Sequence, residues 1–323
     1  MAEMRFAPLG ESGLMVSVVG VGCNAFGSRI DAEQTQAVVD AALEHGITLF
    51  DTADSYGDGA SEELLGRALG PRRDEVVVAT KFGMGEHFAE HWGAHGSRRY
   101  VRRAVEASLR RLGTDHIDLY QLHRPDPITP VEETLQAMSE LVTEGKVRYL
   151  GSSNLSAWQV VDADWVASTG GLQRFVSAQN EYSLYNRAAE AELVPACESA
   201  GGGILPYFPL AYGLLIGKYR RGEAAPKGSR LAASAQAARL AGADWCRVEA
   251  LQAYAAQRGV SLLTLAIGGL AAQPAVASVI SGATRPEQIV ANVDAGLWQP
   301  SAEDLAGLDE LRQSPAFSYT TFA

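Results

Sequence analysis

Residues 47–81, ITLFDTADSYGDGASEELLGRALGPRRDEVVVATK, contain the repeating unit of this fold. Two apolar runs, ITLFD (47–51) and EVVVATK (75–81), enclose GASEELLGRAL (59–69), in which apolar residues recur at helical spacing and Ser61 is the expected N-cap. The near-continuous apolar run of 75–81 is typical of a parallel strand that is buried on both faces. The stretch therefore predicts a strand–helix–strand unit with a right-handed crossover.

The same alternation extends in both directions along the chain. Further strands are expected at 17–22, 116–123, 147–153, 175–182, 203–208 and 277–282. Helices are expected after Asp31, at 99–112, from Pro130 to about Gly145, after Ser156, and at 188–200, 245–258, 261–272 and 286–295. Eight such units predict a closed (β/α)₈ TIM barrel. An open dinucleotide-binding sheet is disfavoured, because GVGCNAFG (20–27) lacks a helix at the required offset.

Composition is that of an ordinary globular chain. The 323 residues are 47% hydrophobic and 20% charged, and we expect one barrel domain over 1–323. The net charge of −11 argues against partners such as nucleic acid or an anionic membrane. The apolar stretch 262–280 is interrupted by two glycines and a proline, so no membrane span is expected. Three scattered cysteines and a start without signal-peptide features predict a reducing, cytoplasmic location.

Two long loops follow predicted strands, residues 82–98 after the third strand and residues 209–244 after the seventh. Both leave the carboxyl ends of strands, which is the face on which barrels build active sites. Loops of this length are usually functional or disordered. We therefore expect the active site on this face.

Polar side chains also gather at the expected carboxyl ends of the strands: Asp51, Tyr56, Lys81, His123, Ser152, Ser153, Asn154, Gln179, Asn180 and Tyr207. A phenol is a poor acid at neutral pH, and an adjacent ammonium lowers its pKa. A carboxylate paired with Lys81 keeps the ammonium charged, and a histidine beside Tyr56 orients a carbonyl oxygen. This group suits proton donation to a developing alkoxide. Reduction also needs a hydride, which implies a nicotinamide cofactor because no side chain supplies one.

Six segments, in this order, resemble the aldo-keto reductase family: FDTADSYGDGASEELLGRAL, VVVATKFG, IDLYQLHRPDP, GSSN, QNEYSL and VISGATRPEQIVANV. The resemblance spans about Leu9 to Asn292 and is nearer to the bacterial and channel-β-subunit branches than to mammalian aldose reductases. It implies a TIM barrel, NADP(H), and the interconversion of carbonyl and alcohol in a small-molecule substrate. The catalytic tetrad of the family falls on Asp51, Tyr56, Lys81 and His123.

The resemblance also implies a set of cofactor-binding residues. Ser153, Asn154 and Gln179 would hold the carboxamide, and Tyr207 would stack on the nicotinamide. The pyrophosphate strap would include Pro209, Leu210, Gly213, Lys218 and Arg230. The adenosine end would be held by Gly282, Thr284, Arg285, Gln288 and Asn292, with the N-terminus of the last barrel helix favouring a 2′-phosphate. Cys23, Asn24 and Asp51 match cofactor-proximal positions. Gly282, Ala283 and Ala291 differ from residues found in some members, which leaves NAD(H) as the alternative cofactor.

Two alternatives to a reductase remain open. The chain could be a non-catalytic NADP(H)-binding regulatory subunit, as the channel-associated branch suggests. The stretch HFAEH (87–91) also matches H-x-x-E-H, so His87, Glu90 and His91 could hold zinc in a hydrolase. The preferred interpretation has no metal and makes this loop a substrate wall built from Phe82, Phe88 and Trp92, with Tyr56 and His123 also in contact with the substrate. Neither the substrate nor the oligomeric state follows from the sequence.

Overall fold

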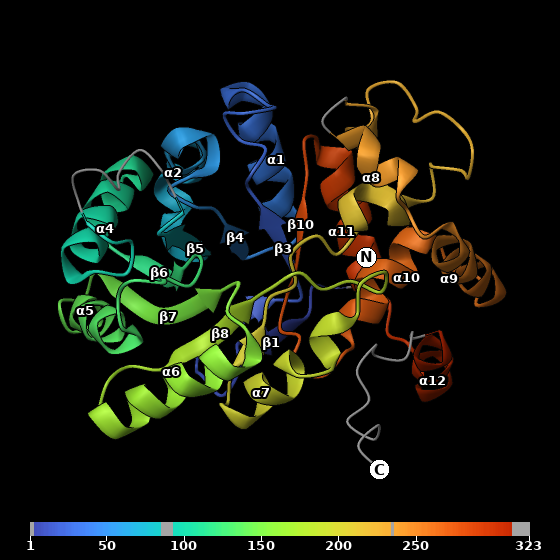
Figure 1. Cartoon of the computed structure of the whole chain (residues 1–323). Helices are drawn as coiled ribbons and strands as arrows, with labels where there is room; N and C mark the ends of the chain where they lie inside the picture. The colour runs from blue at the N-terminus through green and yellow to red at the C-terminus, as the bar shows by residue number, and fades with distance from the viewer. Residues whose placement is uncertain (1–2, 85–92, 234–235, 312–323) are drawn as a thin grey trace, which may run out of the picture.

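The computed structural model describes residues 3–84, 93–233 and 236–311 of the protein. In this part of the chain, eight parallel strands form one curled sheet (Figure 1). The strands are β3 (Val19–Gly22), β4 (Leu49–Asp51), β5 (Val77–Phe82), β6 (Ile117–Leu122), β7 (Val147–Ser153), β8 (Phe175–Gln179), β9 (Gly203–Ile204) and β10 (Val279–Gly282). Their order in the sheet is β10-β3-β4-β5-β6-β7-β8-β9.

Hydrogen bonds between the segments around β9 and β10 close this sheet. The Ile204 amide donates to the Ala275 carbonyl at 2.6 Å, and the Ala277 amide donates to the Ile204 carbonyl at 3.1 Å. Further along, the Ile280 amide donates to the Pro206 carbonyl at 3.2 Å. The first and last strands of the order are therefore neighbours, and the predicted (β/α)₈ barrel is confirmed.

Helices connect the strands and pack on the outside of the barrel (Figure 1). The single crossovers are α1 (Ala32–Glu44), α2 (Ala60–Leu69), α4 (Arg98–Leu112), α5 (Val131–Thr143), α6 (Ala157–Gly170) and α7 (Leu193–Ser199). The connection from β9 to β10 contains α8 (Ala237–Ala241), α9 (Trp245–Gln257) and α10 (Leu262–Ala271), and β10 is followed by α11 (Pro286–Gly296) and α12 (Ala302–Glu310). Short 3-10 helices lie at η1 (Tyr56–Gly59), η2 (Gly70–Glu75), η4 (Ala188–Glu190), η5 (Ala211–Ile216) and η6 (Arg230–Ala232). Within the described ranges, no helix is both long and apolar enough to cross a membrane.

Helix starts follow local sequence rules, with one correction. Asp31 and Ser156 cap α1 and α6 as predicted, each in a reciprocal capping box. Ser61 is not a cap, because α2 begins at Ala60 after Gly59, whose φ of 92° is left-handed. The Ser61 hydroxyl instead donates to the Cys23 carbonyl at 2.9 Å and lies 2.8 Å from the Thr52 hydroxyl. The residue therefore ties α2 to the ends of β3 and β4.

Several predicted elements are shorter than expected. The helix predicted over 188–200 is divided into η4 and α7, so Pro195 lies in the first turn of α7 rather than inside a helix. The strand predicted over 203–208 is regular only at Gly203–Ile204, and Tyr207 adds an isolated bridge to Glu181. The last strand begins at Val279 rather than at 277.

The barrel interior is apolar at the end where the strands begin. Its side chains are Leu49, Ala79, Leu119, Leu205, Ala277 and Ile280. A two-stranded antiparallel ribbon, β1 (Phe6–Pro8) with β2 (Met15–Ser17), precedes the barrel, and Leu9, Leu14 and Val16 pack into this cluster. The amino-terminal end of the barrel is thus filled by the chain itself, which leaves polar side chains for the opposite end.

Candidate active site

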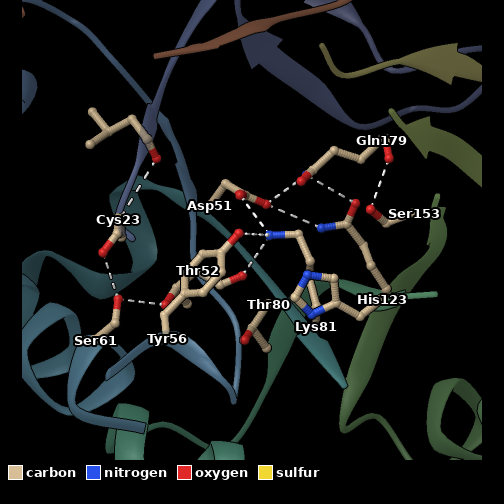
Figure 2. Close-up of polar contacts among 12 residues, drawn as sticks. Cys23, Asp51, Thr52, Tyr56, Ser61, Thr80, Lys81, His123, Ser153 and Gln179 are labelled. Carbon is tan, nitrogen blue, oxygen red and sulfur yellow. Dashed lines mark hydrogen bonds and ion pairs between the residues drawn. The ribbon is translucent and has the colours of Figure 1, made fainter. Parts of the chain in front are cut away.

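A polar layer lies above the apolar interior. Asp51, Lys81, Gln121 and Gln179 come from β4, β5, β6 and β8, and all four are at most 2% exposed. Asp51 is the centre of the layer, because its Oδ1 accepts from Gln179 Nε2 at 2.7 Å and from Gln121 Nε2 at 3.3 Å. Figure 2 shows Asp51 and Lys81 pointing toward one another and toward the Tyr56 hydroxyl. Residues that are far apart in the sequence thus form one buried network.

Lys81 is the buried cation of this network. Its Nζ donates to Asp51 Oδ2 at 2.7 Å, to the Thr52 carbonyl at 2.9 Å and to the Tyr56 hydroxyl at 3.4 Å. Burial opposes the charge, but the Asp51 carboxylate and the Tyr56 phenol outweigh it and raise the pKa of Lys81. The lysine is therefore a fixed positive charge beside the phenol.

Tyr56 reaches this cation because of an unusual turn. After β4 the backbone enters η1, where Gly57, Asp58 and Gly59 have φ values of 57°, 53° and 92°. Glycine adopts this left-handed region without cost, and aspartate tolerates it better than most residues. The turn reverses the chain and lays the Tyr56 ring against Lys81, whose Nζ is 4.9 Å from the ring centroid.

The effect of Lys81 on the pKa of Tyr56 has the predicted sign, but the net shift is in the other direction. The sequence predicted that Lys81 would lower the pKa of the phenol. Burial is the largest influence, however, and it raises the pKa of Tyr56 above its ordinary value, although Lys81 acts in the opposite direction. The phenol therefore keeps its proton throughout the neutral range.

His123 completes the group as a neutral ring. It lies edge-on to Tyr56, with 6.0 Å between the ring centroids. Burial, then the positive charges of Lys81 and Arg124, lower the pKa of His123 to about 3. Its Nδ1 is buried without a hydrogen-bond partner in the described ranges. A neutral imidazole beside a phenol can hydrogen-bond to a ligand oxygen without competing for the proton.

The residues expected to hold a carboxamide surround this group. Asn154 has a left-handed φ of 58°, and its Nδ2 donates to the His123 carbonyl at 2.9 Å and to the Ser153 hydroxyl at 3.0 Å. The Tyr207 hydroxyl donates to Asn154 Oδ1 at 2.7 Å. The nitrogen of the Gln179 amide is committed to Asp51, so the oxygen of this amide is left to accept from a ligand.

The segment after β9 is strained and cationic. Phe208, Ala211 and Tyr212 all have positive φ values of 46° to 59°, next to Pro209, Leu210 and Gly213. Arg230 lies 5.4 Å and 5.2 Å from the ring centroids of Phe208 and Tyr212. Burial, then the charges of Arg29 and Arg239, lower the pKa of Arg230. Non-glycine residues with positive φ gather at ligand sites more often than elsewhere.

No carboxylate in the described ranges forms an ion pair with Arg29, Arg230 or Arg239. Three guanidinium groups without counter-ions are suited to phosphate groups. The sequence prediction included Arg230 and Lys218 but missed Arg239 of α8 and Arg29, which lies in the loop after β3. Lys218 is exposed, with its Nζ 5.3 Å from the Tyr219 ring centroid.

The predicted adenosine-binding residues lie on β10 and the start of α11. The Thr284 amide and hydroxyl both donate to Gln288 Oε1, at 2.7 Å and 3.1 Å. Gly282 ends β10 beside Asn24, and Arg285 is exposed at the N-cap of α11. Asn292 is buried in α11. Cys23 is also fully buried, and burial raises the pKa of its thiol, so it is an inert neighbour of the network.

The predicted substrate wall needs one correction. Phe82 is fully buried and stacks on Tyr120 at 4.8 Å between ring centroids, on the face of β5 opposite to Lys81. Its ring therefore packs under the helices and does not line the mouth. The other predicted wall residues, Phe88 and Trp92, and the zinc candidates His87, Glu90 and His91 lie outside the described residues. Among those that are described, no three His, Cys, Asp or Glu side chains are grouped to hold a metal.

Comparison with known proteins agrees with this geometry. Residues 18–313 match the model of the aldo/keto reductase family. The chain belongs to the aldo-keto reductase family. Relatives of this aldo-keto reductase include a probable voltage-gated potassium channel subunit beta of Oryza sativa subsp. japonica, 38% identical over 90% of this chain and 91% of the relative. The versiconal hemiacetal acetate reductase of Aspergillus parasiticus is 32% identical over 95% of this chain and 96% of the relative, and the uncharacterized oxidoreductase YrpG of Bacillus subtilis is 33% identical over 97% of both.

Proposed function

We propose that this aldo-keto reductase catalyses the reversible NADP(H)-dependent reduction of an aldehyde or ketone, the carbonyl of a sugar included, to an alcohol. The observation that carries the proposal is the convergence of Tyr56 on Lys81 at 3.4 Å and on His123 at 6.0 Å between ring centroids. A protonated phenol, a buried cation and a neutral imidazole on one face meet the needs of a carbonyl oxygen that gains a proton. We assign Asp51, Tyr56, Lys81 and His123 as the catalytic residues.

Each side chain has a separate part in this mechanism. Tyr56 holds the proton that passes to the substrate oxygen, and its raised pKa keeps that proton available in the neutral range. Lys81 stabilises the phenolate that remains, with a charge that Asp51 fixes in place at 2.7 Å. His123 is neutral, so it can orient the carbonyl oxygen toward Tyr56. In the oxidative direction the phenolate accepts the proton instead.

The residues around the tetrad fit a nicotinamide dinucleotide. Ser153, Asn154 and Gln179 present donors and acceptors for a carboxamide, and Tyr207 offers a partly buried ring beside them. Arg29, Arg230 and Arg239, without counter-ions among the described side chains, suit the phosphate groups. When bound, the reduced cofactor supplies the hydride. The position of Arg285 at the N-cap of α11 supports NADP(H) over NAD(H).

A spectrophotometric assay of NADPH oxidation over a panel of aldehydes and ketones tests the proposal. We expect turnover in the wild type and a loss of about 10²–10⁴-fold in kcat for Tyr56→Phe, because the general acid is removed. The Kd for NADPH, measured by quenching of intrinsic fluorescence, is expected to stay close to the wild-type value. A variant that keeps more than about a tenth of the activity excludes Tyr56 as the acid. If the protein binds neither nicotinamide cofactor, the proposed function is wrong.

The second candidate is a non-catalytic cofactor-binding subunit. It is supported by relatives that are named as probable potassium channel subunits beta, at 38% and 37% identity. This candidate predicts tight binding of NADPH with no turnover of any carbonyl in the panel. Both candidates use the whole chain as one barrel domain, and both fit a cytoplasmic protein whose three cysteines are free thiols.

A further inference from the structure

A second group of charged side chains lies behind the tetrad, on the other face of β5. Successive residues of a strand point to opposite faces, so Thr80 points away from Lys81 (Figure 2). The Thr80 hydroxyl donates to Glu62 Oε1 of α2 at 2.6 Å. Glu62 Oε2 in turn accepts from Arg111 of α4, with 2.6 Å to Arg111 Nε. Glu62 is fully buried, whereas Arg111 is partly exposed, and the two opposite charges form an ion pair.

Asp54 adds a third ionisable group to this region. The pairing of β4 with β5 continues beyond Asp51, because the Asp54 amide donates to the Lys81 carbonyl at 3.1 Å. Asp54 is 1% exposed, and neither of its carboxyl oxygens has a well-formed hydrogen bond within the described ranges. Arg111 pairs directly with Glu62, so its charge offsets an ionised Asp54 only in part. An ionised Asp54 would therefore be a buried charge without a partner, which is strongly unfavourable.

The groups that face Asp54 from the surrounding elements do not offset this cost. Burial, then the like charge of Glu62, raise the pKa of Asp54 to about 7, while Arg111 and the backbone amides of Ser55 and Gly83 act in the opposite direction. The two phenols nearby, Tyr100 of α4 and Tyr120 of β6, have raised pKa values, chiefly from burial and then from Asp54 itself. Arg124, which follows β6, acts on Tyr100.

The position of Asp54 links its charge to the catalytic phenol. Asp54 lies two residues before Tyr56, and the Tyr56 amide donates to the Ala53 carbonyl in the same turn. The outer part of the turn, Gly57 and Asp58, is exposed. A movement of this turn would bring water to an ionised Asp54, and it would also break the contact of Tyr56 with Lys81.

We propose that Asp54 is a positioning residue for Tyr56, and that the enzyme turns over only while the Asp54 carboxyl is protonated. The proposal rests on the proposed reductase function. It assigns no proton transfer to Asp54, which acts through the conformation of the Tyr56 turn. Of the tetrad, Tyr56 and Lys81 have pKa values raised above their ordinary values, and that of His123 is about 3. None of these three groups therefore titrates near neutral pH.

The pH dependence of kcat tests the proposal, with Asp54→Asn as the variant and Asp58→Asn as the matched control. Asparagine is the neutral isostere of a protonated aspartate, and Asp58 lies exposed in the same turn. Between about pH 6 and about pH 8.5, a single ionisation near pH 7 lowers wild-type kcat about 30-fold. We expect this fall in the wild type and in Asp58→Asn, with KM little changed. Asp54→Asn is expected to keep kcat within about twofold over the same range. An alkaline fall that persists unchanged in Asp54→Asn overturns the proposal.

A second measurement on the wild type needs neither turnover nor a folded variant. In protein labelled with ¹³C at aspartate carboxyl carbons, one NMR signal is expected to titrate near pH 7, far above the others, with the same midpoint as kcat. If every aspartate titrates below about pH 5.5, the proposal is wrong even if the enzyme is an active reductase. If one signal titrates near pH 7 but no carbonyl is reduced, the carboxyl has the raised pKa described above and the proposed reductase function is wrong. The coupling of Asp54 to turnover is then wrong as well.

Discussion

The substitution Asp54→Asn is expected to change how stability depends on pH, independently of activity. In the unfolded chain Asp54 titrates near its ordinary pKa of 3.8, whereas burial and Glu62 raise the pKa in the folded protein to about 7. Between these two values the folded state binds the proton and the unfolded state does not. Stability therefore falls as the pH rises through this window and levels off above it.

The size of the effect follows from the same two pKa values. A difference between 3.8 and about 7 corresponds to about 4 kcal/mol, since one pKa unit is worth ~1.4 kcal/mol. The wild type carries this penalty above about pH 7.5 and almost none of it below about pH 4. Asp54→Asn removes the ionisation, so its advantage over the wild type is expected to grow to about 4 kcal/mol across the window.

Urea unfolding at a series of pH values between about pH 4 and about pH 8 provides the measurement. The difference in unfolding free energy between Asp54→Asn and the wild type is compared with the same difference for Asp58→Asn. Asp58→Asn removes a carboxylate from the same turn and so controls for the change of residue type. If the curves for the wild type and Asp54→Asn run parallel, Asp54 is not a buried acid with a raised pKa and the reasoning is refuted.

Three further predictions concern the buried Asp51–Lys81 pair, the charge of His123, and the packing of α2 against α4. Lys81→Met leaves the Asp51 carboxylate buried without its cation and is expected to lower the unfolding free energy by about 3–5 kcal/mol, part of which a second substitution, Asp51→Leu, restores. If Lys81→Met is as stable as the wild type in urea unfolding, the two residues do not form a buried ion pair. His123 stays neutral with a pKa of about 3, so its protonation is expected to cause no fall in kcat between about pH 6.5 and about pH 5. A fall in kcat below about pH 6.5 that disappears in His123→Asn would show that the ring is charged. Gly66→Ala places a Cβ 2.2 Å from the Leu112 carbonyl oxygen and is expected to lower the free energy of unfolding by about 1–3 kcal/mol, whereas the control Gly202→Ala, whose Cβ meets nothing closer than 3.7 Å, is expected to leave it nearly unchanged. Equal melting temperatures of the two variants would exclude the clash.

Much of the fold could be predicted because its signals are local. The caps Asp31 and Ser156 satisfy backbone amides within three residues, and both were predicted. Ser61 has the residue type of a cap, but tertiary contacts with Cys23 and Thr52 determined its use. The helix predicted over 188–200 was divided because Pro195 cannot lie in a helix interior.

The candidate site also contains some residues that the sequence predicted and others that it placed wrongly or missed. Asp51, Tyr56, Lys81 and His123 were predicted because parallel strands bring their carboxyl ends to one face, whatever the details of packing. Phe82 was placed on the wrong face, because a change of one residue along a strand reverses the direction of the side chain. Gln121 and Arg29 were missed, since an amide inside a strand and an arginine in a loop carry no motif of their own.

The sequence by itself determined the alternation of strands and helices, and with it the barrel and the residues at its mouth, because periodicity and capping act over a few residues. Only the tertiary structure decided the electrostatics. The pKa of Tyr56 is raised rather than lowered, and Asp54 is a buried acid beside the Glu62–Arg111 pair. Both results depend on how much water the packed helices exclude and on which charges they bring together, and neither quantity is a property of adjacent residues.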